Sequence, residues 1–592
     1  MTFTGWLTIF GFALILTALA MPLGSYMAAV YSGERTFMDP VLRIPERFLY
    51  RAMRVDPASP SHPQDWKAYA KSVILFSLAG WLLLYLILRT QGLWSWTGLN
   101  PEGFHSAPWN VTFNTTSSFV TNTNWQYYGG ETTMSYFSQM AGLTVQNFVS
   151  AATGIVVAVA LIRGIVSRSG KSLGNFWQDL VRTVLYVLLP ISIVIAIILV
   201  SQGVLQTFGG YLTAHGVTGL TQSIARAPVA SQEAIKELGT NGGGIFSTNS
   251  AHPFENPTGF TNLVEMLAVL VIPAALVFMY GKMVGSRRQG YAIYSTMMIM
   301  FLGAVIVAYV AEAHGSPAQH AAGLHTGVIA GSAGGNMEGK EARFGIAGSA
   351  LFDVVTTVTS CGAVNSAIES FTGIGGAVPF ANLSASEVIF GGVGTGLYSI
   401  LLYVLLAVFL GGLMVGRTPE HLGKKIEARE IKLVVLGILI TPLAALFATA
   451  LAVASSAGRA SISAAATGPQ GFSETLYTYL SQANNNGSAL AGYGGFIQPA
   501  AGNLGSHGIT FADLVGGFVM LFARFAPILF ALAVAGSLAG KRISPAGLGT
   551  MRTDNPTFVV LLIGVIVLVG ALTFFPALLL GPIVQGLTGH LY

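Results

Sequence analysis

The sequence predicts an all-α integral membrane protein with ten transmembrane helices, and three observations lead to this class. Of the 592 residues, 53% are hydrophobic and only 9% are charged, whereas roughly a quarter of the residues in a soluble domain are charged. Apolar runs of about 20 residues, long enough to cross a bilayer, recur along the whole chain. Four of the loops between these runs contain a short stretch followed by a polar cluster. Most of the chain is therefore expected to lie in the membrane.

The apolar runs define the ten expected spans. The first run has no basic segment before it and is too long for the apolar core of a typical signal peptide, so we interpret it as a retained helix. In chain order the spans cover residues 5–31, 70–90, 134–165, 176–202, 260–285, 291–314, 381–416, 430–457, 511–536 and 556–580.

Lysine and arginine residues gather in every second loop, starting with the loop after the first span. These loops and their flanks hold most of the 29 basic residues. Because basic loops stay in the cytoplasm, both chain termini are expected on the outer side. The net charge of +5 comes from these loops and forms no concentrated basic patch with interleaved aromatic residues, so no nucleic-acid role is expected. The single cysteine, Cys361, excludes an intrachain disulfide.

Four of the remaining loops share one pattern, in which a stretch too short to span is followed by Thr, Asn, Ser and Gly. The short stretches lie near residues 107–120, 229–238, 347–358 and 472–483. The polar clusters read VTNTNWQ from Val120, GTNGGG from Gly239, TSCGAVN from Thr359 and NNNGSA from Asn484. They recur about every 120 residues, which indicates an internal repeat. The predicted units are 68–166, 167–286, 287–420 and 421–540, with extra segments 1–67 and 541–592.

This pattern predicts a pseudo-fourfold pore in which each unit contributes a span, a pore helix, a loop and a second span. Non-helical backbone is tolerated at membrane depth only where it is buried in protein or lines water, so the four loops should converge. Glycine lets the backbone turn carbonyl oxygens toward a cation that has lost its water, and half-helix dipoles favour positive charge. A single cluster would be an ordinary extracellular turn. The matched period favours a selectivity filter, most simply for potassium, although the TVGYG motif of potassium channels is absent.

The four clusters, together with SAHPFENP from Ser250 and GRTPEHLGKKI from Gly416, resemble the potassium-binding A subunits of bacterial Kdp potassium-transporting ATPases. This family belongs to the superfamily of potassium transporters that includes the Trk and Ktr proteins. The resemblance covers essentially the whole chain. It implies a non-catalytic subunit of the bacterial inner membrane, with no cofactor, that takes potassium from the outer side. It also implies an intramembrane tunnel to the B subunit, a P-type ATPase, in a Kdp complex that contains the C subunit and the small F subunit as well.

The resemblance also assigns the filter positions, whose backbone carbonyls would be the potassium ligands. They are Asn122, Thr123 and Asn124; Thr240, Asn241 and Gly242; Ser360, Cys361 and Gly362; and Asn485, Asn486 and Gly487. Asn124 occupies the position at which the other three loops have glycine. This difference predicts an asymmetric filter, in which the quarter formed by the first loop differs from the other three. Gln126 either braces the first loop or faces water. Cys361 is interpreted as a small buried residue without redox chemistry.

Two features below the expected filter are candidate gates. Arg524 lies in the middle of the ninth span, too far from either end to reach water easily, and would repel potassium from a direct route to the cytoplasm. The alternative is a buried pair between Arg524 and Glu387. The seventh span contains GGVGTG, with Gly391, Gly392, Gly394 and Gly396, which predicts a broken helix and a gating loop. The alternative there is a tight helix crossing.

Other signals are weaker. Three acidic residues, Glu265, Glu312 and Asp353, either concentrate cations at the outer side or cap helices. The tripeptide Gly170, Lys171, Ser172 lacks the first glycine of a nucleotide-binding loop. No aspartate is followed by KTGT, and no histidine pair has the spacing of a helical zinc site. An intramembrane enzyme is therefore not expected. The open alternative is a self-sufficient Trk-like or Ktr-like channel or symporter driven by ion gradients.

Overall fold

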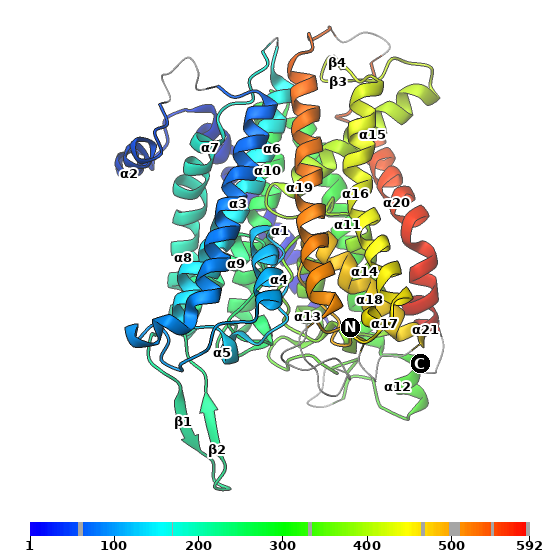
Figure 1. Cartoon of the computed structure of the whole chain (residues 1–592). Coiled ribbons are helices and arrows are strands. Elements are labelled where there is room, and N and C mark those ends of the chain that lie inside the picture. Colours follow the sequence, from blue (N-terminus) through cyan, green and yellow to red (C-terminus); the bar gives the residue numbers. More distant parts are fainter. Residues whose placement is uncertain are drawn as a thin grey trace.

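The structure of the protein is a computed structural model that describes residues 1–56, 63–168, 170–329, 334–462, 468–495, 510–545 and 550–587. Within these residues, ten helices are long and apolar enough to cross a membrane, which confirms the predicted number. Figure 1 shows them as one bundle of steeply inclined helices. Their main elements are α1 (Phe3–Ser32), α3 (Trp66–Thr90), α6 (Val145–Val166), α8 (Leu189–Ser201), α10 (Gly259–Met283), α11 (Arg287–His314), α15 (Thr395–Met414), α16 (Ala428–Ala454), α19 (Phe511–Ala539) and α20 (Pro556–Leu578). Several spans also include adjoining helical segments, and the fourth runs from Phe176 to Ser201 and ends with the 13-residue α8.

Four short helices lie between consecutive spans, at the stretches that the sequence singles out. They are α4 (Trp109–Val120) between α3 and α6, α9 (Val229–Leu238) between α8 and α10, α13 (Gly345–Thr357) between α11 and α15, and α18 (Gly468–Ala483) between α16 and α19. The order of span, short helix, loop and span thus occurs four times, with α1 and α20 outside it. The exact unit boundaries and a fourfold axis remain predictions.

Shorter elements extend or connect the spans. The helical ones are α2 (Asp39–Ala52), η1 (Gln91–Thr97), α5 (Gly130–Thr133), η2 (Ser138–Thr144), α7 (Phe176–Arg182), η3 (Thr183–Leu188), η4 (Asn249–Ala251), α12 (Pro317–Ala321), η5 (Ile368–Ser370), α14 (Gly373–Ser384), α17 (Ser456–Arg459), η8 (Leu579–Ile583) and α21 (Val584–Leu587). Two antiparallel hairpins pair β1 (Leu212–His215) with β2 (Thr221–Ile224), and β3 (Glu420–His421) with β4 (Lys424–Lys425).

Local sequence signals explain where several spans begin and end. The Thr258 side chain caps α10 in a reciprocal capping box with Thr261, and the Asn555 side chain caps α20, which opens with a proline. Helix α1 ends at Gly33, whose φ of 75° lies in the left-handed region. These caps satisfy backbone groups that the helix itself leaves unpaired.

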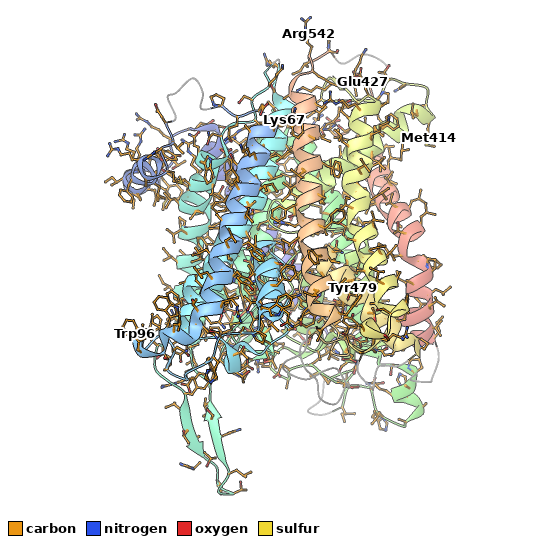
Figure 2. The ribbon with its side chains drawn as sticks, in the orientation of Figure 1. Lys67, Trp96, Met414, Glu427, Tyr479 and Arg542 are labelled. Carbon is orange, nitrogen blue, oxygen red and sulfur yellow. The ribbon has the colours of Figure 1, made fainter. Side chains whose placement is uncertain are left out.

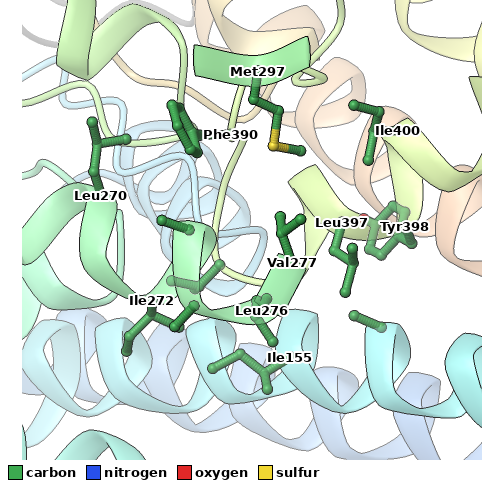
Figure 3. Packing of buried hydrophobic residues seen from close by; sticks show 14 of the residues in the cluster. Ile155, Leu270, Ile272, Leu276, Val277, Met297, Phe390, Leu397, Tyr398 and Ile400 are labelled. Carbon is green, nitrogen blue, oxygen red and sulfur yellow. The ribbon is translucent and has the colours of Figure 1, made fainter. Parts of the chain in front are cut away.

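The core of the bundle is apolar and closely packed around the second span of each unit. Figure 3 shows Ile155, Leu276, Met297, Phe390 and Leu397 from neighbouring elements meeting in this core, and all five are at most 1% exposed. Small residues allow the backbones to approach, as where Gly164 of α6 packs against Ala535 of α19.

The seventh span is broken, as its glycines predict, but the break is wider than expected. Helix α14 ends at Ser384, the next ten residues are not helical, and α15 begins at Thr395. The predicted span of 381–416 is therefore corrected, because its first helical half reaches back to Gly373. The break starts before the first glycine, since Ser386, Glu387 and Phe390 also have positive φ. These residue types do not predict a left-handed backbone.

The two ends of the bundle differ in charge. Lys67, Glu427 and Arg542 lie at one end, called the basic end below, whereas Trp96 lies at the opposite end (Figure 2). The β1–β2 hairpin projects from the end opposite to the basic one, where the start of α1 and the last described helix, α21, are also found (Figure 1). The first and last described helical segments therefore share one side of the bundle, opposite to the basic loops.

Candidate cation filter

Each of the four short helices runs directly into one of the four polar loops. We name these loops 1 (residues 121–126), 2 (239–244), 3 (358–363) and 4 (484–488). The structure brings all four together in the interior, where the filter residues predicted from the sequence are at most 3% exposed wherever they carry a side chain. Segments that lie more than 350 residues apart in the chain are thus in direct contact, as shown by the 2.9 Å hydrogen bond from Asn485 Nδ2 to Thr123 Oγ1.

The contacts between the loops close a ring in the order 1, 4, 3, 2 and back to 1. The backbone contacts are Gly487 with the Thr123 carbonyl, Gly362 with the Asn486 carbonyl, Gly242 with the Cys361 carbonyl, and Gly243 with Asn124. In the first three pairs a methyl group added to the glycine would overlap the neighbouring carbonyl oxygen. Such close approach of backbones is possible only without a side chain.

The residues aligned across the four loops share one backbone conformation. Gly242, Gly362 and Gly487 have φ values of 84°, 77° and 101°, and Asn124 has a φ of 54°. Asparagine tolerates this left-handed region better than most residues, which explains its place in loop 1. Its side chain leaves the ring, because Asn124 Nδ2 donates to Asn147 Oδ1 on α6 at 2.7 Å.

Two positions earlier, three of the loops have a second left-handed residue. These are Asn122 (73°), Thr240 (50°) and Asn485 (51°). A left-handed residue reverses the way the next peptide group faces, so the backbone can present carbonyl oxygens that an extended strand would point to opposite sides. The conformation is costly for residues other than glycine, and such strain is retained where the surroundings impose it.

The asparagine side chains of the predicted filter are used to hold neighbouring loops. Asn122 Nδ2 donates to the Thr240 carbonyl at 2.8 Å, and Asn241 Nδ2 donates to Asn122 Oδ1 at 2.5 Å. Asn486 Nδ2 donates to the Thr359 carbonyl at 2.7 Å. Among the amide oxygens, Asn122 Oδ1 accepts from Asn241 and Asn486 Oδ1 accepts from the Ser488 N–H, whereas Asn241 Oδ1 has no hydrogen-bond partner among the described residues. The asparagine side chains thus join neighbouring loops mainly through their N–H groups.

Gln126 forms two hydrogen bonds between loops 1 and 2. Its Nε2 donates to the Gly244 carbonyl at 3.1 Å, and the Gly244 N–H donates to its Oε1 at 3.0 Å. The side chain therefore faces loop 2, in the manner of a brace.

Replacing Gln126 with leucine is expected to weaken potassium binding about tenfold. The change leaves both backbone groups of Gly244 without this partner, and an unsatisfied buried group costs ~1–3 kcal/mol. Potassium dependence of the activity of the purified complex measures the effect. The matched control is Gln206→Leu, because Gln206 makes a similar pair of hydrogen bonds with Ser231 on the surface. Equal behaviour of the two variants would contradict the bracing role.

A buried ion-pair cluster supports loop 2, and it was not foreseen from the sequence. Lys236 of α9 lies 2.8 Å from both Glu233 and Glu255, and all three are at most 1% exposed. Its ammonium also donates to Asn249 Oδ1, and Asn249 Nδ2 donates to the Gly242 carbonyl at 2.5 Å. The signal was present, since Lys236 and Glu233 are one turn apart on a short helix and Glu255 lies in the SAHPFENP motif.

The other acidic residues that the sequence marks are buried too. Glu265 and Glu312 are 0% exposed and Asp353 is 2% exposed, so none of them can gather cations at an outer surface. Glu312 instead pairs with Lys340 at 2.7 Å. Cys361 is fully buried, and its thiol donates to Glu237 at 3.4 Å.

The broken segment between α14 and α15 packs directly beneath loops 2 and 3. The Gly391 N–H donates to the Val358 carbonyl at 2.9 Å, and the Val393 N–H donates to Thr240 Oγ1 at 3.1 Å. A side chain at Gly392 would overlap that of Ser360. The glycines of GGVGTG thus lie against the loops rather than at an ordinary helix crossing.

The remaining two glycines of this motif also lie against backbone. Gly394 has a φ of 87° and packs on the Gly154 carbonyl of α6, and Gly396 packs on the Phe390 carbonyl. A larger residue at Gly394 would push the segment away from α6, and one at Gly396 would distort the segment itself.

Arg524 lies beside this segment and is 3% exposed. Its NH1 donates to Thr395 Oγ1 at 2.6 Å, and its NH2 points toward Gly154 and has no hydrogen-bond partner among the described residues. No ion pair within 4.0 Å joins Arg524 to Glu387 in the part of the chain that the structure covers. The close pair considered as an alternative is therefore not formed.

A small cavity lies between α15, α16 and α19, and Asn485 of loop 4 is part of its lining. Its volume is about 20 Å³. The lining includes the polar groups of Glu387, Thr395, Tyr398, Thr441 and Asn485. Polar groups at membrane depth mark ion pathways or buried networks.

The β3–β4 hairpin joins the ends of the second spans at the basic end. Lys424, 1% exposed, donates to the Gly164 carbonyl at the end of α6 at 3.0 Å and to the Leu538 carbonyl at the end of α19 at 2.6 Å. His421 Nε2 is hydrogen-bonded to the Tyr280 hydroxyl of α10 at 3.0 Å. Burial lowers the pKa of Lys424 to about 8, so it is still mostly charged at neutral pH. The motif GRTPEHLGKKI contains Lys424, but its residue types do not indicate this role.

Replacing Lys424 with methionine is expected to lower the thermal stability of the protein. The two helix-end carbonyls lose a charged donor, which costs ~1–3 kcal/mol in total, reduced by the relief from burying a charge. Melting in detergent, followed by tryptophan fluorescence, measures the change. Lys425→Met is the control, because Lys425 is the exposed neighbour in the same strand. A melting temperature lowered equally by both variants would contradict the assignment.

Comparisons with known proteins give the family. The chain matches the model of the potassium-transporting ATPase A subunit over residues 10–587. The potassium-transporting ATPase potassium-binding subunit of Mesorhizobium japonicum is 53% identical over 587 residues, 99% of each chain. The protein of the same name from Granulibacter bethesdensis is 52% identical over 595 residues, 100% of each chain.

A solved structure shows the same fold. The potassium transporter TrkH from Vibrio parahaemolyticus aligns with 90% of this chain and 98% of its own, with a TM-score of 0.50 and 13% sequence identity. At that identity the likeness concerns the fold alone. The match of the family model over nearly the whole length, with relatives above 50% identity, assigns the chain to the family of potassium-transporting ATPase A subunits.

Proposed function

We propose that this chain is the potassium-binding subunit of an ATP-driven potassium uptake complex, and that loops 1 to 4 form its selectivity filter. The observation that carries the proposal is the closed ring of four loops in which glycine backbones rest on neighbouring carbonyls. The names of the relatives, potassium-transporting ATPase potassium-binding subunits, agree with it. In this proposal the chain itself hydrolyses no ATP and needs no cofactor. Potassium is the ion that it transports.

Backbone oxygens in the ring replace the water that potassium loses on entry. The ligand positions are Asn122, Thr123, Asn124, Thr240, Asn241, Gly242, Ser360, Cys361, Gly362, Asn485, Asn486 and Gly487. Carbonyl rings suit a large monovalent cation because they supply several oxygens without the strong charge of carboxylates. The short helices end at the loops, so the negative ends of their dipoles favour a cation there.

Direct passage toward the basic end is blocked at two levels. The Arg524 guanidinium lies beside the broken segment, and the Lys424 ammonium lies between the ends of α6 and α19. A desolvated potassium ion would be repelled by both charges. Potassium leaves sideways instead, and the polar cavity that Asn485 of loop 4 helps to line is the start of that route.

The ion passes to a P-type ATPase, the B subunit, within a Kdp complex that also contains the C subunit and the small F subunit. The complex lies in the bacterial inner membrane. The basic loops face the cytoplasm and both termini face outward, because lysine and arginine residues favour the cytoplasmic side. Potassium then enters from the end of the bundle that carries the termini.

Co-purification tests this function. The chain, expressed with its neighbouring genes and purified in mild detergent, should retain an ATPase partner, and potassium should stimulate ATP hydrolysis. A chain that purifies alone and carries out rubidium uptake without ATP would instead support the self-sufficient channel or symporter. The relatives' names do not favour that alternative.

A further inference from the structure

Helix α2 is an amphipathic helix attached to the outside of the bundle at the basic end. It packs beside α7 and η3 (Figure 1). One side, formed by Leu42, Glu46 and Tyr50, is buried against the protein. The Glu46 carboxylate accepts hydrogen bonds from Tyr50 at 2.8 Å and Tyr186 at 3.0 Å, and pairs with Arg182 at 3.1 Å. The helix is therefore held in one orientation.

Two further sides of this helix are exposed. The apolar stripe consists of Phe37, Val41, Ile44 and Phe48, which are 78%, 68%, 75% and 69% exposed. The basic stripe consists of Arg43, Arg47 and Arg51, which are also exposed. At about 100° per residue, the two stripes lie roughly 100° apart around the helix axis. Within the described residues, no arginine of the basic stripe forms an ion pair within 4.0 Å.

Exposure of an apolar stripe of this size to water is unfavourable. The neighbouring elements indicate what covers it. The neighbouring span α8 exposes Ile193, Val194 and Ile197, which are 50%, 56% and 65% exposed. These residues form a lipid-facing surface in a span whose membrane-crossing segment is strongly apolar. This span begins with α7 at Phe176, and α2 packs beside α7 and η3, so α2 lies at the level where the membrane-crossing segment begins.

We propose that α2 lies in the headgroup region of the membrane leaflet at the basic end and binds anionic phospholipid. The apolar stripe enters the boundary of the acyl chains, and the basic stripe contacts lipid phosphates. Helices with an apolar side and an arginine-rich side take up this interfacial position. Charge complementarity selects anionic over zwitterionic lipid, because the three arginines of the basic stripe are exposed and form no ion pair with a described residue.

Site-specific labelling tests the position of the apolar stripe. The single cysteine of this chain, Cys361, is fully buried, so within the chain Ile44→Cys is the accessible thiol for a fluorophore. The complex without this substitution, treated in the same way in lipid nanodiscs, gives the background labelling of the partner subunits. Phosphatidylglycerol brominated on its acyl chains is expected to quench this label about twofold. A label at Arg47→Cys is the control and should be quenched much less. Equal exposure of both labels to aqueous iodide would overturn the proposal, as would an Ile44 label shielded from both quenchers by a partner protein.

A charge test addresses the basic stripe. The double variant Arg43→Gln/Arg47→Gln is expected to lower the ratio of phosphatidylglycerol to phosphatidylcholine retained by the purified complex more than about threefold. The control is Arg417→Gln/Arg542→Gln, which removes the same charge from exposed positions in loops at the same end. An unchanged ratio in the α2 variant, or an equal loss in the control, would overturn the proposal. Both readouts concern lipid, so their failure leaves the proposed filter unaffected.

Discussion

Gly242→Ala is expected to abolish potassium stimulation of the ATPase in the purified complex. Gly242 has a φ of 84°, and its position leaves no space for a methyl group beside the Cys361 carbonyl. The left-handed backbone alone costs an alanine ~1–2 kcal/mol. The overlap then forces loop 2 away from loop 3, so that carbonyls of both loops leave the ring. A loss of more than about 1.4 kcal/mol lowers the affinity at least tenfold.

The control for this variant is Gly303→Ala. Gly303 is in the span α11, and a methyl group there meets no atom within 4 Å. It should leave the potassium dependence of ATP hydrolysis unchanged. Measuring ATPase activity against potassium concentration for both variants, with the amount of assembled complex checked by size exclusion, separates a filter defect from loss of assembly. A Gly242→Ala complex that assembles and responds to potassium normally would contradict the filter.

The asparagines of the loops show why we expect the ring of loops to be sensitive to such changes. The Asn241 side chain contacts loop 1 and the Asn486 side chain contacts loop 3. Each of these side chains thus ties its own loop to a neighbouring loop. A displacement of one loop is transmitted to the next, because buried amides that lose their partners are costly.

The sequence predicted the membrane fold well because length and hydrophobicity largely decide what can cross a bilayer. The four short helices and their loops were also recognisable, since three loops carry glycine at the same place and the period repeats. The same alignment identified Asn124 as the exception, and the structure gives it the same left-handed conformation.

Other features could not be predicted, because they depend on long-range contacts. Lys424 looks like one more basic residue of a charged loop, and only the fold places it between the ends of α6 and α19. For Lys236 the sequence shows Glu233 one turn away on the same helix, but only the fold brings Glu255, 19 residues further on, to the same ammonium. The sequence around Ser386 and Glu387 does not predict their left-handed backbone conformation. Tertiary packing imposes their conformation, as it does at other strained sites.

Arg524→Gln is expected to open an ATP-independent leak of potassium or rubidium through the complex. The Arg524 guanidinium is 3% exposed, is held by Thr395 and lies beside the broken segment beneath the filter. In an environment of low dielectric constant, a fixed positive charge a few ångströms from the pathway raises the energy of a passing cation by several kcal/mol. Rubidium efflux from proteoliposomes without ATP measures the leak, and we expect an increase of about tenfold or more.

Arg524→Lys separates charge from shape at this position. Lysine keeps the positive charge but lacks the planar group that reaches both Thr395 and the region of Gly154, so it should retain most of the block. Arg542→Gln, which removes an exposed charge at the basic end, should leave the efflux rate unchanged. An Arg524→Gln complex that assembles normally and shows no added efflux would argue against Arg524 as a gate, because the fixed positive charge would then not be what stops the cation.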